Sequence, residues 1–230
     1  MKIFLTVSLL LAASASAPAG PGLKRSDEVQ RLDRATEVFS EIMKTPDKGV
    51  PEDLLHRSAC IAIVPGLKKG GLGLGGRYGK GVVMCRKGNG SWSAPSFMTV
   101  EGGSVGLQIG FQQIDLVMLI MNREGMEKLI GDKLTVGADA SAAAGPVGRQ
   151  TSAETNIRMD AKILTYSRAK GLFAGITLNG AVVKQDKDDN RDFYGREMEA
   201  REILFGDSVP MPREARALAS ALSWKSPRKR

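Results

Sequence analysis

The chain has 230 residues, and its 33 lysines and arginines outnumber 25 acidic residues to give a formal net charge of +8 at pH 7. Aromatic residues make up only 5% of the sequence, which argues against a base-stacking platform for single-stranded nucleic acid. With one histidine and no cysteine–histidine cluster, the sequence favours a binding protein over an enzyme or metalloprotein. The length suits one sizeable core, and the basic charge points to an anionic partner.

Residues 1–19 have the pattern of a secretory signal peptide. Lys2 supplies the positive start, an apolar run over 3–13 follows, and small residues at 15–17 or 17–19 suit cleavage. The apolar run is too short to span a bilayer comfortably. We therefore expect an exported protein of the periplasm or cell envelope, with a mature net charge of +7.

Residues 26–44 are predicted to form an amphipathic helix that starts at Ser26. Its apolar face recurs at steps of three and four residues: Val29, Leu32, Thr36, Phe39 and Met43. Such a stripe is typical of a helix that packs on its own domain, and docking on a membrane is the alternative. A short helix over 51–58 follows, and its His56 is interpreted as a surface or capping residue.

From residue 60 onward, apolar runs and glycine-rich turns predict strands at 60–64, 72–78, 82–86, 97–100, 105–111 and 116–121. Further strands are expected over 134–145, 163–166, 172–178 and 181–184, the last two joined in a hairpin by Asn179-Gly180. Helices are expected at 122–130, 194–204 and 212–222. Together these elements predict an α+β domain. Its sheet should be largely antiparallel, strongly curved or partly closed into a barrel, with about ten short strands between N- and C-terminal helices.

One stretch, residues 64–111, combines glycine with positive charge, and no acidic residue occurs between Asp53 and Glu101. Its candidate anion-binding residues are Lys68, Lys69, Arg77, Lys80, Arg86 and Lys87. Because no carboxylate is near them in the sequence, their field is expected to act on something outside the stretch. The glycines allow close approach of backbone or ligand. Protection of a strand edge is the plainer interpretation of any single lysine, whereas the whole set indicates an anion-binding ribbon.

The dinucleotide-binding spacing of Gly71, Gly73 and Gly76 is set aside. The residues that follow, 77–86, predict a strand instead of the required helix, and no acidic residue lies about 20 positions on.

Cys60 and Cys85 lie in apolar runs and are predicted to be buried free thiols. Export would permit a disulfide, which is the alternative.

Two sets of acidic residues are candidate sites. The first set follows the spacing of the oxygen ligands in a calcium-binding loop and consists of Asp186, Asp188, Asn190, Asp192 and Glu197. Arg191 stands where that loop needs glycine, so a polar turn that caps the following helix is favoured. Asp115, Asp139 and Asp160 are interpreted as structural hydrogen-bond acceptors, with an unrecognised hydrolase as the alternative.

Several segments carry a resemblance to a known family. They are PGLKKGGLGLGGRYGKGVVMCR (65–86), WSAPSFMTVEGGSVGLQIGFQ (92–112), DLVMLIMN (115–122), LTVGADASAAAGPVGR (134–149), AKILTYSRAKGLFAGITLNGAVV (161–183), YG (194–195) and EILFG (202–206). In this order they resemble the SYLF domain, and the likeness runs from about residue 26 to 222. A basic tail follows at 223–230.

The resemblance implies a non-enzymatic, lipid-binding module. In eukaryotic relatives the preferred ligands are phosphoinositides, and some members bind actin. For this chain, the resemblance and the basic ribbon together predict binding to anionic phospholipid membranes without a cofactor or metal. A protein partner, as in the actin-binding members, and nucleic acid are the alternatives.

Overall fold

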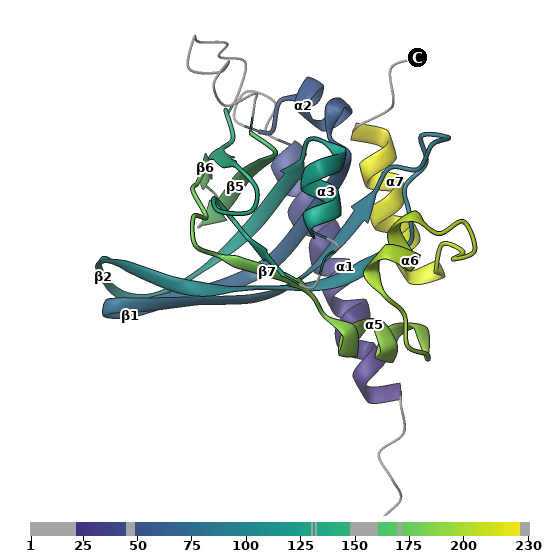
Figure 1. Cartoon of the computed structure of the whole chain (residues 1–230), viewed down its shortest axis with the longest axis horizontal. Helices are drawn as coiled ribbons and strands as arrows, with labels where there is room; N and C mark the ends of the chain where they lie inside the picture. Colours follow the sequence, from purple (N-terminus) through teal and green to yellow (C-terminus); the bar gives the residue numbers. More distant parts are fainter. Residues whose placement is uncertain are drawn as a thin grey trace, which may run out of the picture.

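The computed structural model describes residues 22–44, 49–129, 131, 133–147, 161–169 and 172–225. The expected signal peptide, Asp160 and the tail after residue 225 lie outside the described residues. A strongly curved, largely antiparallel sheet carries helices from both ends of the chain, which confirms the α+β class (Figure 1).

The strands are β1 (Cys60–Cys85), β2 (Ser96–Ile120), β3 (Leu134–Thr135), β4 (Ala142–Ala144), β5 (Ile163–Ala169), β6 (Leu172–Gly175) and β7 (Val182–Gln185). The helices are α1 (Gly22–Met43), α2 (Glu52–Arg57), α3 (Arg123–Leu129), α5 (Lys187–Tyr194), α6 (Ala200–Phe205), the 3-10 turn η1 (Arg213–Ala215) and α7 (Arg216–Lys225). Among these helices, none combines the length and the apolar character needed to cross a membrane.

Two long strands form the centre of the sheet. β1 and β2 pair antiparallel from Cys60 opposite Ile120 to Val83 opposite Ser96. The sequence predicted six short strands here, but most of the intervening glycines, those at 66, 70, 71, 79, 81, 102 and 103, lie inside the two strands instead of in turns. β2 also pairs with β5 and β7, β3 with β7, β6 with β5, and β4 lies parallel to β5. The β1–β2 ribbon extends well away from the rest of the domain (Figure 1).

The β1–β2 ribbon runs outward and then doubles back. Its outward arm pairs residues 60–72 with 109–120, and its return arm pairs 74–83 with 96–105. The two arms pack closely at glycines in the return arm. A Cβ at Gly81 would come within 2.5 Å of the Ile63 carbonyl oxygen, and one at Gly79 within 2.7 Å of Val64 Cγ1. The glycines therefore let one arm lie directly on the other.

A disulfide between Cys60 and Cys85 closes the base of the ribbon, so the prediction of free thiols is wrong. The two cysteines lie at opposite ends of β1, and both are fully buried. Beside the bridge, the Arg86 N–H donates to the Ala59 carbonyl oxygen at 2.8 Å. Only the doubling back brings these ends together, and spacing along the sequence does not reveal it.

The sheet has an apolar core on each face. One core packs against α1 and α7, and the other lies inside the curve of the sheet, around the disulfide. Leu32, Phe39 and Met43 of α1 are buried in the first core. This confirms that α1 packs on its own domain, although the helix begins at Gly22 instead of Ser26.

Three local predictions were wrong. The Asn179-Gly180 turn forms, with the Ala181 N–H donating to the Leu178 carbonyl oxygen at 2.8 Å. The strands on either side are not hairpin partners, however, because β6 pairs with β5 and β7 pairs with β2 and β3. The helix expected at 194–204 begins only at Ala200, because α5 ends at Tyr194 and its C-cap Gly195 lies in the left-handed region (φ 73°). The strand expected over 134–145 is reduced to β3 and β4 at its ends.

One buried carboxylate ties α1, β1 and α5 together. Asp189 Oδ2 accepts from Arg31 Nη1 of α1 at 2.5 Å, and Asp189 Oδ1 accepts from Lys80 Nζ of β1 at 2.8 Å. Lys80 also pairs with Asp186 at 2.9 Å. The Asp186 side chain accepts from the Asp189 N–H at 3.1 Å and caps α5. A capping role is therefore confirmed, but the segment forms the capped helix itself instead of a turn before a helix at 194–204.

These contacts shift the pKa values of Lys80 and Asp186 in opposite directions. Burial works to lower the pKa of Lys80, but the hydrogen bonds that its ammonium group donates to Asp189 and Asp186 outweigh burial and leave the pKa above its ordinary value. Burial likewise works to raise the pKa of Asp186, and the contact with Lys80 outweighs it and lowers the pKa. The cluster therefore favours the charged forms of both groups.

Removal of the disulfide should lower stability without changing the fold. The two cysteines are 25 positions apart, and closing a loop of that length corresponds to roughly 3–4 kcal/mol in the free energy of unfolding. Urea unfolding of the Cys60→Ser/Cys85→Ser variant against the wild type measures the loss. Equal unfolding midpoints, or an intact mass that does not rise by two hydrogens on reduction, would contradict the bridge.

Neutralising Asp189 should lower the free energy of unfolding markedly, whereas neutralising the neighbouring Asp188 should not. Asp189→Asn leaves Arg31 and Lys80 without their shared partner, and we expect a loss of about 2–4 kcal/mol. Asp188 is the matched control, because its side chain is 76% exposed and pairs only at the surface with Arg191. Asp188→Asn should change stability by less than about 0.5 kcal/mol. Similar losses in both variants would contradict the buried tie.

The lowered pKa of Asp186 predicts a dependence of stability on pH. The stability that this group confers is complete above its unfolded value of 3.8 and is lost as the pH falls through the lower folded-state value. Asp186→Asn keeps the helix cap but removes the ion pair with Lys80. The variant should therefore lose less stability than the wild type between pH 5 and pH 2, roughly the range over which a paired aspartate titrates. Parallel acid-unfolding curves would contradict this assignment.

Candidate functional site

The structure separates the six candidate basic residues into different roles. Arg86 Nε donates to the Ser58 carbonyl oxygen at 3.2 Å, and its guanidinium lies 4.4 Å from the centre of the Trp92 ring. Lys87 Nζ donates to the Gly206 carbonyl oxygen at 3.2 Å. These two residues hold connections at the base of the ribbon, so the structure gives them an architectural role.

Arg77 and Lys80 are both half-buried in the return arm. Burial lowers the pKa of the Arg77 guanidinium, and its Nε is buried without a hydrogen-bond partner among the described residues. Lys80 binds Asp186 and Asp189 as described above. The absence of acidic residues from this stretch of sequence therefore does not leave Lys80 unpaired, because α5 brings carboxylates to it from more than a hundred positions away.

Lys68 and Lys69 differ from Lys80 and Lys87. They lie side by side on the outward arm, opposite Gln113 and Gln112. Lys68 is exposed and Lys69 half-buried. No ion pair or hydrogen bond of either ammonium group is seen within the part of the chain that the structure describes. Of the four lysines in the predicted set, these two have no partner among the described residues.

A β-bulge determines the direction in which Lys68 points. The register of β1 against β2 shifts between Val64 and Leu67, so both of these side chains enter the core inside the curve of the sheet. Regular alternation would have placed residues 64, 66 and 68 on one face. The extra residue therefore turns Lys68 to the face that carries α1. Gly66 forms the bulge with φ 64°, and its N–H donates to Asp115 Oδ1 at 2.9 Å.

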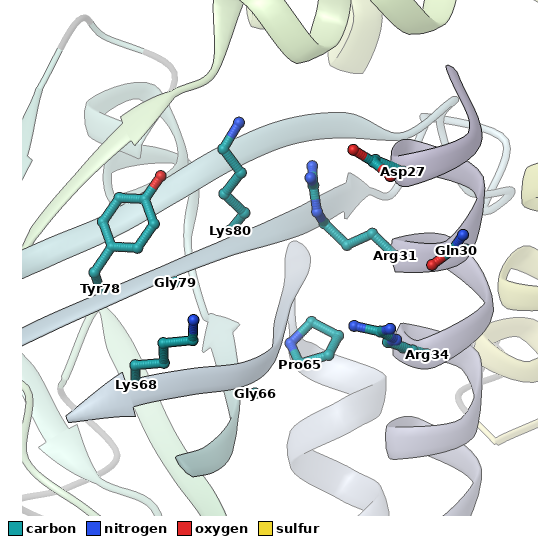
Figure 2. A pocket seen from close by; sticks show the side chains of 10 residues that line it. All are labelled: Asp27, Gln30, Arg31, Arg34, Pro65, Gly66, Lys68, Tyr78, Gly79 and Lys80. Carbon is teal, nitrogen blue, oxygen red and sulfur yellow. The ribbon is translucent and has the colours of Figure 1, made fainter. Parts of the chain in front are cut away.

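Lys68 then lines a pocket of about 370 Å³ between α1 and the ribbon. Four cationic side chains surround this basic pocket: Arg31 and Arg34 from α1, and Lys68 and Lys80 from β1. Figure 2 shows Arg34 and Lys68 on either side of Pro65, with Lys80 and Arg31 farther along the same opening and Asp27 at its rim. Asp189 binds Arg31 and Lys80, whereas Arg34 has no such partner among the described residues.

The two arginines were not identified from the sequence. Arg31 and Arg34 lie one helical turn apart on α1, outside the acid-free stretch, and their spacing alone does not distinguish them from an ordinary solvated helix face. The tertiary contact between α1 and the return arm makes them part of the site. The signal available in the sequence was the i,i+3 pair of arginines, without any indication of what the pair faces.

The candidate carboxylates hold the fold instead of forming an acid/base pair. Asp115 binds Arg168 Nη2 at 2.7 Å as well as the Gly66 N–H, and Arg168 also pairs with Glu41 of α1. Asp139 accepts from the Thr135 N–H at 2.6 Å. These contacts confirm the structural interpretation of both residues. The spacing Gly102-x-Ser104-x-Gly106 matches a hydrolase nucleophile motif, but it lies within β2 and not at a strand-to-helix turn.

Comparison with known proteins identifies the family. Residues 101–224 match the family described as "Ysc84: Las17-binding protein actin regulator". The chain is 35% identical over 199 residues to SH3 domain-containing YSC84-like protein 1 of Rattus norvegicus, an alignment that covers 85% of this chain and 58% of the relative. The human protein of the same name is 34% identical over 198 residues, covering 85% and 57%.

A yeast relative is similar over a shorter region. LAS seventeen-binding protein 3 of Saccharomyces cerevisiae is 34% identical over 169 residues, which cover 72% of this chain and 37% of the yeast protein. This chain therefore spans little more than half the length of the animal relatives and less of the yeast one. The relatives are named as binding or regulatory proteins and not as enzymes. The family match and these similarities show that the chain belongs to the Ysc84 family, whose shared unit is the SYLF domain.

Proposed function

We propose that this protein binds the surface of anionic phospholipid membranes through the basic pocket and the adjoining outward arm of the ribbon. The observation that carries the proposal is the position of Lys68 and Arg34. These two cations face one opening from separate elements, and among the described residues neither is neutralised by an acid. Lys69 at the next position of the arm is a third cation, half-buried on the opposite face of the strand. Phosphate groups of lipids are the anions that such a surface would meet after export.

The expected affinity is modest, because much of the positive charge is already balanced. Arg31 and Lys80 share Asp189, and Asp27 lies at the rim of the pocket. The three available cations contribute roughly 1 kcal/mol each near an anionic surface. A total of about 3 kcal/mol corresponds to binding weaker than about 1 mM. Useful affinity therefore requires a second, apolar contribution from the same surface.

A protein partner is a second candidate, supported by the relatives' names. Both the family description and the yeast relative refer to binding of a protein, Las17, and the family is described as an actin regulator. An acidic protein surface would suit the same cations. Sedimentation with actin filaments but not with vesicles would favour this candidate, and strong binding to DNA at physiological salt would favour nucleic acid.

Reversing the available charges should weaken binding to anionic vesicles. Combining Lys68→Glu with Arg34→Glu replaces two cations at the opening by two anions, and we expect at least a tenfold loss of affinity for phosphatidylglycerol vesicles, on the order of 1.4 kcal/mol or more. Vesicle sedimentation at low salt measures this loss. Raising the salt should bring the wild type towards the variant, because the interaction is screened beyond about 10 Å at roughly 0.1 M salt.

Arg201 provides the matched control. It is exposed on α6, which lies on the side of the domain away from the ribbon (Figure 1). Arg201→Glu lowers the net charge by the same amount per residue and should leave vesicle binding almost unchanged. Equal losses per reversed charge in the two variants would mean that net charge, and not the pocket, determines binding. A folded wild-type protein that ignores anionic vesicles at low salt would refute the proposed function.

A further inference from the structure

The ribbon carries an exposed aromatic side chain beside the available cations. Phe111 of β2 is 94% exposed, the most exposed large apolar residue among those described. It pairs with Gly70, one register step from Lys69–Gln112 and two from Lys68–Gln113. A Cβ at position 70 would overlap the Phe111 ring, so the glycine lets the ring lie across the ribbon. Nothing within the described part of the domain covers the outer surface of this ring.

The side chain of Phe111 lies on the same face of the ribbon as Lys68, which lines the basic pocket. Side chains alternate along a strand, so Phe111 and Gln113 share one face of β2, and their partners Gly70 and Lys68 share the same face of β1. The bulge at Gly66 has turned that face towards α1. Nearer the base α1 covers the face, whereas the far end of the ribbon extends beyond the helix (Figure 1), and the ring of Phe111 is almost fully exposed. An apolar ring and a free ammonium group thus point the same way on a projecting structure.

We infer that the β1–β2 ribbon is a membrane wedge, in which Phe111 enters the boundary between headgroups and acyl chains while Lys68 and Lys69 bind lipid phosphates. This inference rests on the proposed function and supplies the apolar contribution that the available charges lack. The flanking cations select a lipid surface as the partner, because an exposed phenyl ring next to unpaired lysines complements an interface that is anionic outside and apolar within. Beyond Phe111, most residues of β1 and β2 are of glycine or apolar type, with Leu72 paired to Ile109 and Gln108 as a polar exception.

Two tryptophan reporters test where the protein touches the bilayer. Phe111→Trp combined with Trp224→Phe places a reporter on the ribbon. The wild-type chain is the matched control, because its Trp224 is 81% exposed on α7, away from the ribbon. Trp92 is 4% exposed and gives the same buried background in both proteins. With phosphatidylglycerol vesicles, emission from the ribbon reporter should shift to the blue and be quenched by brominated acyl chains, and Trp224 emission in the wild type should not change.

Replacing the Phe111 ring by a smaller side chain should weaken vesicle binding without changing the salt dependence of that binding. Phe111→Ser should reduce affinity for the same vesicles by roughly tenfold, the scale expected for burial of a phenyl group, and should retain the salt dependence of the wild type. Phe111→Leu should lose less than Phe111→Ser. Because the side chain is exposed, both variants should keep the circular dichroism spectrum and unfolding midpoint of the wild type.

The outcomes separate this inference from the function on which it rests. Binding that persists with no blue shift or quenching of the ribbon reporter would overturn the wedge and leave membrane binding intact. No binding of the wild type would overturn both. If Phe111→Ser instead dissolves an oligomer of the wild type in the absence of vesicles, as measured by sedimentation velocity, the ring mediates contact between copies of the chain and the wedge is overturned.

Discussion

The packing of the β1–β2 ribbon on itself is the constraint on which the rest of the structure depends. Backbone hydrogen bonds join β1 to β2 along the whole ribbon. The outward and return arms, by contrast, pack on each other face to face. The meeting requires glycines at 79 and 81, where any side chain would strike the backbone or apolar side chains of the other arm. The disulfide between Cys60 and Cys85 then fixes the base. Together these features create a projecting element in a small α+β domain.

The positions of the functional groups follow from that arrangement. The bulge at Gly66 reverses the alternation of the outward arm, so Lys68 faces the side of α1 instead of the interior. Asp115 supports the bulge, and it reaches α1 indirectly through Arg168 and Glu41. Asp189 of α5 holds Lys80 of the return arm and Arg31 of α1 in place and reduces their effective charge. The site therefore combines two cations without an acidic partner among the described residues, Lys68 and Arg34, with two that are paired with Asp189.

The division between held and free cations could not be predicted from the sequence. The acid-free stretch identified a basic β-ribbon, and the amphipathic pattern identified α1 and its buried face. Whether Lys80 is neutralised depends on where α5 lies, because its carboxylate partners are more than a hundred positions away in the sequence. The disulfide and the broken hairpin at Asn179-Gly180 were mispredicted for a related reason, since local turn chemistry does not specify which strands become partners. Strand type was predictable, whereas strand length and pairing required the whole fold.

The central claim is that the ribbon and the adjoining part of α1 form the surface that meets a membrane. Hydrogen exchange of the folded protein with and without anionic vesicles tests it most directly, because slowed exchange marks the backbone that the bilayer covers. The account predicts protection over residues 66–71, 109–113 and 30–34, with none on α6 or α7. Protection centred on α6 and α7, with the ribbon exchanging as in the free protein, would contradict it.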